Sequence, residues 1–223
     1  RFCLPDISKI NNVEVANISK LDSITFADGQ KVNNQSVSLI TDAHTFISSQ
    51  TASSSSSLSF TSGIDSTYDV YEFHFIDMHP SYNSDYFGFQ VNAAGQSGFN
   101  ETITSTMFRA VHNESGSTGS LEYQGGGSPY DQAQGTSYQS MAWWVGADND
   151  QSASGILTLY APSSTTYVKH FTSRAAYSQH SNYIFDAHVA GYINTTSAID
   201  EIDFKFSNGN IDAGEIRMYG VKG

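Results

Sequence analysis

Apolar and polar residues alternate one by one through much of the chain after residue 40. In the stretch YDVYEFHFIDM, the residues Tyr71, Phe73 and Phe75 fall on one face. Glu72 and His74 fall on the other face. A period of two places successive side chains on opposite sides of an extended backbone, so this stretch is predicted to be a half-buried strand.

The same alternation recurs at intervals up to the C-terminus. The further predicted strands are YFGFQV, ITSTMFRAV, SMAWWVG, SGILTLYAP, YVKHFTSR, YIFDAHVAGY, DEIDFKF and GEIRMYGV. In DEIDFKF the pattern puts Ile202, Phe204 and Phe206 inward, and it puts Asp203 and Lys205 outward. Together these segments indicate about nine or ten strands, whereas no stretch keeps helical apolar spacing for three turns.

One apolar and one polar face per strand is typical of antiparallel sheets packed over a single core. We therefore predict an all-β fold, an antiparallel two-sheet jelly-roll sandwich over residues 41–223. A closed barrel is the alternative. The serine-rich passage SSQTASSSSSLSF is predicted to be a loop that leads into the first sandwich strand at Leu58 and Phe60.

Residues 1–40 follow a different rule, because Lys9, Lys20 and Lys31 stand eleven residues apart. The apolar positions that recur with them are Ile10, Val15, Leu21, Phe26, Val32 and Val37. An eleven-residue period is compatible with a right-handed helical supercoil. However, the units are rich in weak helix formers and turn residues, which favours a short strand, a turn and a return step in each unit.

Each unit of this arm has too few apolar side chains to bury a core alone, and stacked repeats use their neighbours for that. We therefore expect the arm to pack against copies of itself in a homo-oligomer, or against a larger assembly. The alternative is an irregular extension that lies on its own sandwich.

Charge narrows the range of partners. The chain has 10 Lys and Arg against 22 Asp and Glu, a net charge of −12. Binding to nucleic acid depends on a basic face that neutralises phosphates, so a nucleic-acid partner is not expected. Attraction to anionic membranes is disfavoured for the same reason, and no apolar run is long enough to span a bilayer. Cys3 is the only cysteine, so no intramolecular disulfide is predicted.

Candidate catalytic chemistry is weak. A glycoside hydrolase of the laminarinase type needs a second glutamate after Glu-x-Asp, but after Glu201 and Asp203 the chain has Lys205 and Phe206 at the permitted positions. The closest histidines, His74 and His79, match no common metal-ligand spacing. We expect no enzyme activity, no cofactor and no metal.

Aromatic residues offer a better candidate for binding. Trp143 and Trp144 are adjacent on a predicted strand, so their side chains are expected on opposite faces, one in the core and one at the surface. An exposed tryptophan, with Tyr130 nearby, can stack on a sugar ring; contact with a neighbouring subunit or loop is the alternative.

Several long phrases carry a family resemblance: ISKINNVEVANISKLDSI, GIDSTYDVYEFHFIDMHP, VNAAGQSGFNETITSTMFRA, APSSTTYVKHF and GYINTTSAIDEIDFKFSNGNIDAGEIRMYGV. They cover most of the chain and resemble structural proteins of marine tailed bacteriophages, especially cyanophages. In those proteins, similar repeats precede a lectin-like (concanavalin-like) sandwich that ends in a YG strand.

The resemblance implies a component of the virion surface, such as a fibre, a tail-associated protein or a capsid appendage. Its implied partners are its own copies, of which a trimer is one form, and other virion proteins. Host-surface glycans are further partners if the sandwich serves in host attachment. No catalytic residues accompany the resemblance.

Overall fold

The computed structural model describes residues 44–127 and 129–222, and the strands that span 9–10, 13–14, 31–32 and 35–36. The chain divides into two units, Arg1–Asp42 and Ala43–Gly223. The sequence analysis placed this boundary at residue 40. Every regular element in the described ranges is a strand, and they contain no helix long and apolar enough to cross a membrane.

The first unit contains two short antiparallel hairpins. Strand β1 (Lys9–Ile10) pairs with β2 (Val13–Glu14), and β3 (Lys31–Val32) pairs with β4 (Gln35–Ser36). Ile10 and Val32 of the predicted arm therefore lie in strands. The other predicted arm residues, Val15, Leu21, Phe26 and Val37, lie outside the described residues. The repeat architecture of the arm stays a prediction.

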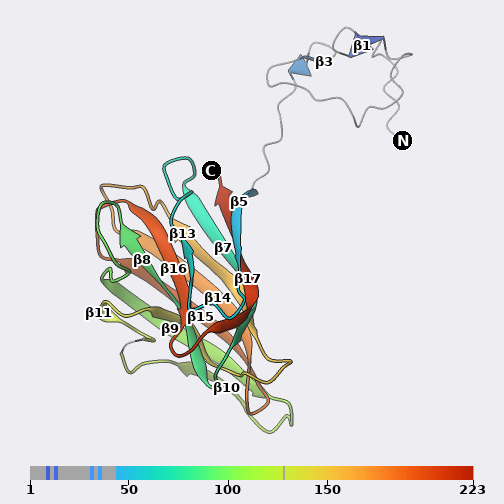
Figure 1. Ribbon diagram of the computed structural model, residues 1–223, viewed down its shortest axis with the longest axis vertical. Coiled ribbons are helices and arrows are strands. Elements are labelled where there is room, and N and C mark those ends of the chain that lie inside the picture. The colour runs from blue at the N-terminus through green and yellow to red at the C-terminus, as the bar shows by residue number, and fades with distance from the viewer. Residues whose placement is uncertain are drawn as a thin grey trace. The chain divides into compact units, whose positions relative to one another are not determined.

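The second unit is built from strands β5 to β17 (Figure 1). Their bounds are β5 (His44–Thr51), β6 (Leu58–Phe60), β7 (Val70–Pro80), β8 (Asp85–Ala93), β9 (Ile103–Asn113), β10 (Gly119–Tyr123), β11 (Ala133–Gly135), β12 (Gln139–Val145), β13 (Ala153–Tyr160), β14 (Lys169–Gln179), β15 (Tyr183–Ile193), β16 (Ile199–Phe206) and β17 (Ile211–Val221). Each segment predicted to be a strand overlaps one of them, with ends that differ by up to a few residues.

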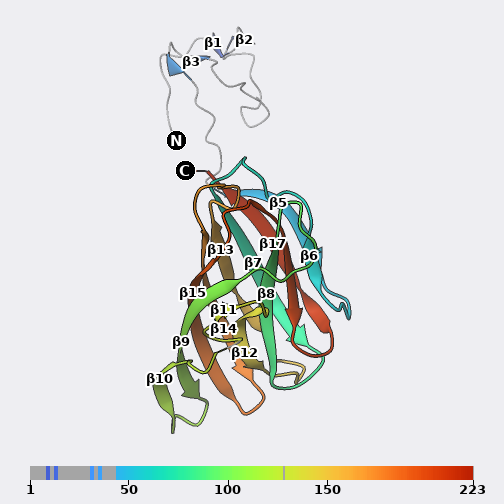
Figure 2. The same ribbon diagram turned by 90° about the vertical axis from the view of Figure 1, so that its left-hand side faces the viewer.

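These strands form two antiparallel sheets, seen from a second side in Figure 2. The nine-stranded sheet has the order β10-β9-β15-β14-β13-β7-β17-β5, with β11 also paired to β9. The four-stranded sheet has the order β12-β8-β16-β6. The predicted all-β, two-sheet antiparallel sandwich is therefore confirmed in preference to a closed barrel. Its jelly-roll connectivity stays a prediction.

Strict alternation places the large aromatic side chains between the sheets. Phe73 and Phe75 of β7 are fully buried and point at the small sheet. The Phe75 ring lies 5.3 Å from Phe87, and the Phe73 ring lies 5.5 Å from Phe204. Burial of each such side chain contributes about 1.5–3 kcal/mol, so this aromatic layer is the main attraction between the two sheets.

One side chain on the outer face of the small sheet departs from the prediction. Asp203 was expected to be exposed beside Lys205, but it is only 3% exposed. Its carboxylate accepts hydrogen bonds from the Ser59 hydroxyl at 2.5 Å and from the Tyr138 hydroxyl at 2.7 Å. The prediction was wrong because alternation gives the side of the sheet on which a residue lies, but it does not reveal that a distant segment covers it.

The serine-rich passage also differs from the prediction. Its first residues belong to β5, which pairs with β17 at the edge of the large sheet, and its last residues form β6. Strand β5 has no buried residue, so its sequence lacks an apolar face and resembles a loop. The loop prediction was therefore wrong for Ser48 to Thr51.

The chain enters and leaves the sandwich at the same end. His44, the first residue of β5, pairs with Val221 of β17, and Val221 also pairs with Val70. At the other end, Gln179 pairs with Tyr183 across the β14–β15 turn, and Tyr183 pairs with Asn113. The turns at that second end are therefore far from the point where the N-terminal segment joins.

Candidate functional site

The outer face of the nine-stranded sheet carries a shallow groove that crosses the strands. Its floor consists of short side chains on four neighbouring strands: Thr106, Ala190, Thr172 and Thr158. The strand register aligns these four residues in one row, and the row ends at Glu72 of β7. The groove has a volume of about 460 Å³.

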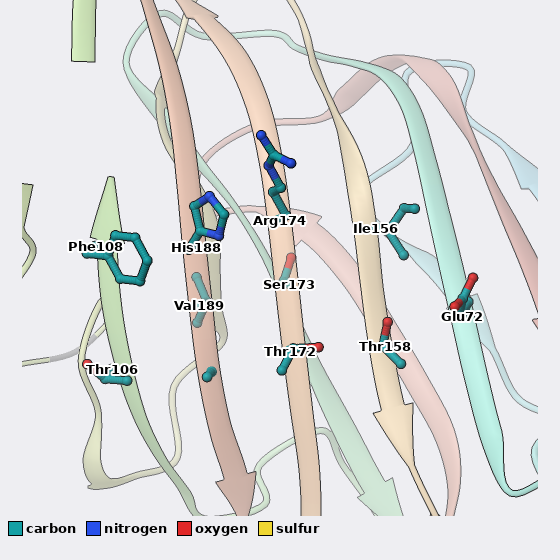
Figure 3. Close-up of a pocket in the computed structure, with 11 residues that line it drawn as sticks. Glu72, Thr106, Phe108, Ile156, Thr158, Thr172, Ser173, Arg174, His188 and Val189 are labelled. Carbon is teal, nitrogen blue, oxygen red and sulfur yellow. The ribbon is translucent and has the colours of Figure 1, made fainter. Parts of the chain in front are cut away.

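A second row of larger side chains forms one wall of the groove. It consists of Phe108, His188, Arg174 and Ile156, which the register also aligns across β9, β15, β14 and β13. Figure 3 shows the two rows side by side, with the Phe108 and His188 rings at one end and Glu72 at the other. A row of short residues beside a row of long ones leaves the hollow between them.

The opposite side of the floor continues into a second hollow. It shares Thr106, Thr172 and Ala190 with the groove and is bounded by His170 and Tyr192. These two rings lie 6.3 Å apart on neighbouring strands. The two hollows together form one surface in which threonine hydroxyls lie between aromatic rings.

Ionic contacts hold the wall of larger side chains in place. The Arg174 guanidinium donates two hydrogen bonds of 2.9 Å to the Asp186 carboxylate, and His188 Nε2 lies 3.3 Å from the same group. The Arg174 hydrogen bonds hold the pKa of Asp186 below its ordinary value. The His188 ring also stacks on Phe108, with centroids 4.9 Å apart and ring planes 3° from parallel. These contacts keep both rings oriented towards solvent.

The far end of the groove carries a small polar cluster. Glu72 Oε2 lies 2.9 Å from His74 Nε2 and 3.1 Å from His44 Nε2. The Tyr219 ring lies 4.8 Å from His74. His74 and His188 are both half-buried on this face, as expected of strand residues opposite the core. Among the described residues, no three His, Cys, Asp or Glu side chains are grouped so that they could hold a metal ion.

The three aromatic residues predicted as sugar contacts lie together in the structure, away from this groove. The Trp143 ring lies 4.4 Å from Tyr130 and 4.3 Å from Trp144. Tyr86 completes the cluster, 5.8 Å from Tyr130. The Tyr130 hydroxyl lowers the pKa of Tyr86, whereas burial raises the pKa of Tyr130.

The expected separation of the two tryptophans onto opposite faces is wrong. Trp144 has φ +66°, in the left-handed region, and the register of β12 shifts between Trp143 and Val145. Such a bulge breaks the alternation of a strand. Both indoles are therefore half-buried in one cluster instead of being divided between core and surface.

Asp203 and Glu201, the carboxylates considered for hydrolytic chemistry, make hydrogen bonds within the protein. Both oxygens of Asp203 accept hydrogen bonds from protein hydroxyls, from Ser59 and Tyr138. Glu201 Oε2 accepts one of 2.9 Å from the Asn92 amide. These contacts stabilise the small sheet and join it to the segment that covers it.

The groove itself was not found in the sequence. Its floor residues are threonines and an alanine at outward strand positions, which are ordinary residues for such sites. A row of short residues is visible only when the register of four strands is known. The outward threonines of neighbouring predicted strands were the only available signal.

Comparison with known proteins adds nothing to the geometry. No protein-family model, no curated protein and no solved structure matches this chain.

Proposed function

We propose that this chain is a non-enzymatic component of a virion surface, and that its sandwich binds a cell-surface glycan along the groove of the nine-stranded sheet. The observation that carries the binding role is the row of threonines beside aromatic rings. The resemblance of the sequence to bacteriophage structural proteins supports the virion setting.

An extended saccharide fits the groove chemically. Neighbouring strands lie about 4.8 Å apart, which is close to the length of one sugar ring in an extended chain. Thr106, Thr172 and Thr158 therefore offer hydroxyls, each able to donate and accept, at intervals that follow such a chain. Phe108 and His188 present flat rings at one end. Aromatic rings pack well on the apolar faces of sugars.

Blocking the floor of the groove tests this role. A glycan array of surface polysaccharides, followed by calorimetry with the strongest ligand, is expected to detect binding. Thr172→Trp is expected to weaken that binding about tenfold or more, equivalent to about 1.4 kcal/mol, because the indole fills the floor. Thr45→Trp on edge strand β5 is the matched control, since Thr45 is exposed outside the groove. No detected binding to any glycan on the array, or unchanged affinity in Thr172→Trp, would contradict the proposal.

We further propose that residues 1–40 assemble the chain with its own copies. Light scattering is expected to show an oligomer for the whole chain and a monomer for residues 41–223. The sandwich has its own complete apolar core, so the shorter chain is expected to remain folded. An identical oligomeric state for both chains would show that the arm does not drive assembly.

A further inference from the structure

A second pocket lies between strands β9, β10 and β15 of the large sheet and strand β12 of the small sheet. Its volume is about 440 Å³, and it is lined chiefly by Arg109, Glu122, Trp144, Gln179, Tyr183 and Phe185. It adjoins the β9–β10 hairpin and the β14–β15 turn, at the end of the sandwich opposite to His44. It shares no lining residue with the groove.

The central group of this pocket is an almost fully buried arginine. Arg109 is 5% exposed, and it lies on the inner face of β9. Its guanidinium carbon is 4.3 Å from the centroid of Trp143 and 4.4 Å from that of Phe185. Trp144 is 5.8 Å away. A guanidinium held between aromatic rings is fixed in orientation by cation–π attraction.

The hydrogen-bond donors of Arg109 exceed the acceptors around it. Nε and Nη2 donate to Glu122 Oε2 at 3.1 and 2.9 Å, but Nη1 is buried and has no partner. A guanidinium carries five N–H donors, so most of them are unused here. An unpaired buried donor is costly, and the Tyr177 hydroxyl beside Arg109 is likewise buried without a partner, so this part of the core holds unsatisfied polar groups.

Glu122 is not expected to accept a further hydrogen bond from Arg109 Nη1, because its carboxylate already accepts four hydrogen bonds. Oε2 also accepts from the Gln124 amide at 3.2 Å, and Oε1 accepts from the Ser120 hydroxyl at 2.9 Å. Burial raises the pKa of Glu122, but the Ser120 and Arg109 hydrogen bonds outweigh it and hold the pKa below its ordinary value. The ion pair is therefore intact and neutral overall, with spare donors on the arginine side.

We propose that this pocket binds one uncharged sugar ring, independently of the groove. Trp144 and Tyr183 offer ring faces for the apolar side of a pyranose, and Arg109 and Gln179 offer planar polar groups for its hydroxyl oxygens. A neutral ion pair with unused donors selects an oxygen-rich neutral ligand over a second carboxylate beside Glu122.

The chain has two tryptophans, and both belong to the aromatic cluster beside this pocket. Intrinsic tryptophan fluorescence therefore reports on this pocket and not on the groove, which contains no tryptophan. Titration of the whole chain with glucose, galactose, mannose and N-acetylglucosamine is expected to shift the emission for at least one sugar. The expected dissociation constants are about 1 mM.

Two variants make the test specific. Trp144→Gly keeps a residue suited to positive φ and removes the stacking face, so affinity is expected to fall about tenfold or more. Arg109→Lys keeps a cation beside Glu122 but removes the spare planar donors, with a similar expected loss. Ligand-observed NMR serves as the second readout, because Trp144→Gly also removes part of the fluorescence.

Three results would overturn the proposal: unchanged emission with every sugar up to its solubility limit, equal affinity in Trp144→Gly, or tenfold tighter binding of glucuronate than of the neutral sugars. If Arg109→Lys fails to fold, Trp144→Gly still decides the question. Loss of glycan binding in Thr172→Trp, with unchanged monosaccharide affinity by ligand-observed NMR, would separate the groove from this pocket.

Discussion

Replacement of Phe204 by alanine is expected to lower the free energy of unfolding by about 3–5 kcal/mol. Phe204 is fully buried on β16, and its ring lies within 6.5 Å of four other phenylalanine rings from both sheets. Those rings are Phe60, Phe73, Phe87 and Phe89. Their backbones are fixed in hydrogen-bonded sheets, so they cannot collapse into the space that the deleted ring leaves.

Urea denaturation followed by tryptophan fluorescence measures this loss, because both tryptophans report on the sandwich. In a chain of this size, the loss corresponds to a fall in Tm of about 10 °C. Phe46→Ala on edge strand β5 removes the same atoms from a side chain that is 56% exposed, and it is expected to cost less than about 1 kcal/mol. Equal effects at the two positions would show that the aromatic layer does not hold the sheets together.

The second large effect is expected at Gly155, where alanine should cost about 3 kcal/mol or more. A Cβ there would lie 2.6 Å from Phe75 Cζ and 2.9 Å from Ala175 Cα, and it would also meet the Arg174 carbonyl oxygen. Gly155 is in β13, between β7 and β14 in the middle of the large sheet. Backbone on one side and a buried ring on the other leave the new methyl group no space, so the strand itself must move.

The matched control is Gly119→Ala at the start of β10. Its Cβ would find its nearest neighbour at 3.6 Å, an ordinary contact with the His112 ring. This change is expected to alter stability by less than about 0.5 kcal/mol. Thermal unfolding of the two variants, measured by circular dichroism beside the parent chain, checks both values. Similar melting temperatures for Gly155→Ala and Gly119→Ala would contradict the packing described around Gly155.

Strands with one buried face could be predicted, and strands without one could not. Strand β10 and strand β5 lie at the two ends of the nine-stranded path, and none of their residues is buried. A strand that buries no face has no apolar alternation, so its sequence does not differ from that of a loop. The long strands β7 and β15 bury alternate residues along most of their length, and the segments YDVYEFHFIDM and YIFDAHVAGY predicted them closely.

The candidate sites also combine features that the sequence could predict with features that it could not. Trp143, Trp144 and Tyr130 could be chosen by residue type, but the bulge at Trp144 that brings the two indoles together has no sequence signal of its own. Arg109 was not predicted as a site residue, because an arginine on a strand is normally solvated. Its burial depends on β12 and β15, whose residues are distant in sequence.

Local periodicity was thus enough to determine the all-β class and the inward face of the long strands, because the side of a strand on which a residue lies depends only on its neighbours in sequence. Only the tertiary structure decided which strands are adjacent, in what register, and what covers them. Those features arise from contacts between residues far apart in the chain. They align Thr106, Thr172 and Thr158 into one floor, bury Asp203 under Tyr138, and enclose Arg109 between two aromatic rings.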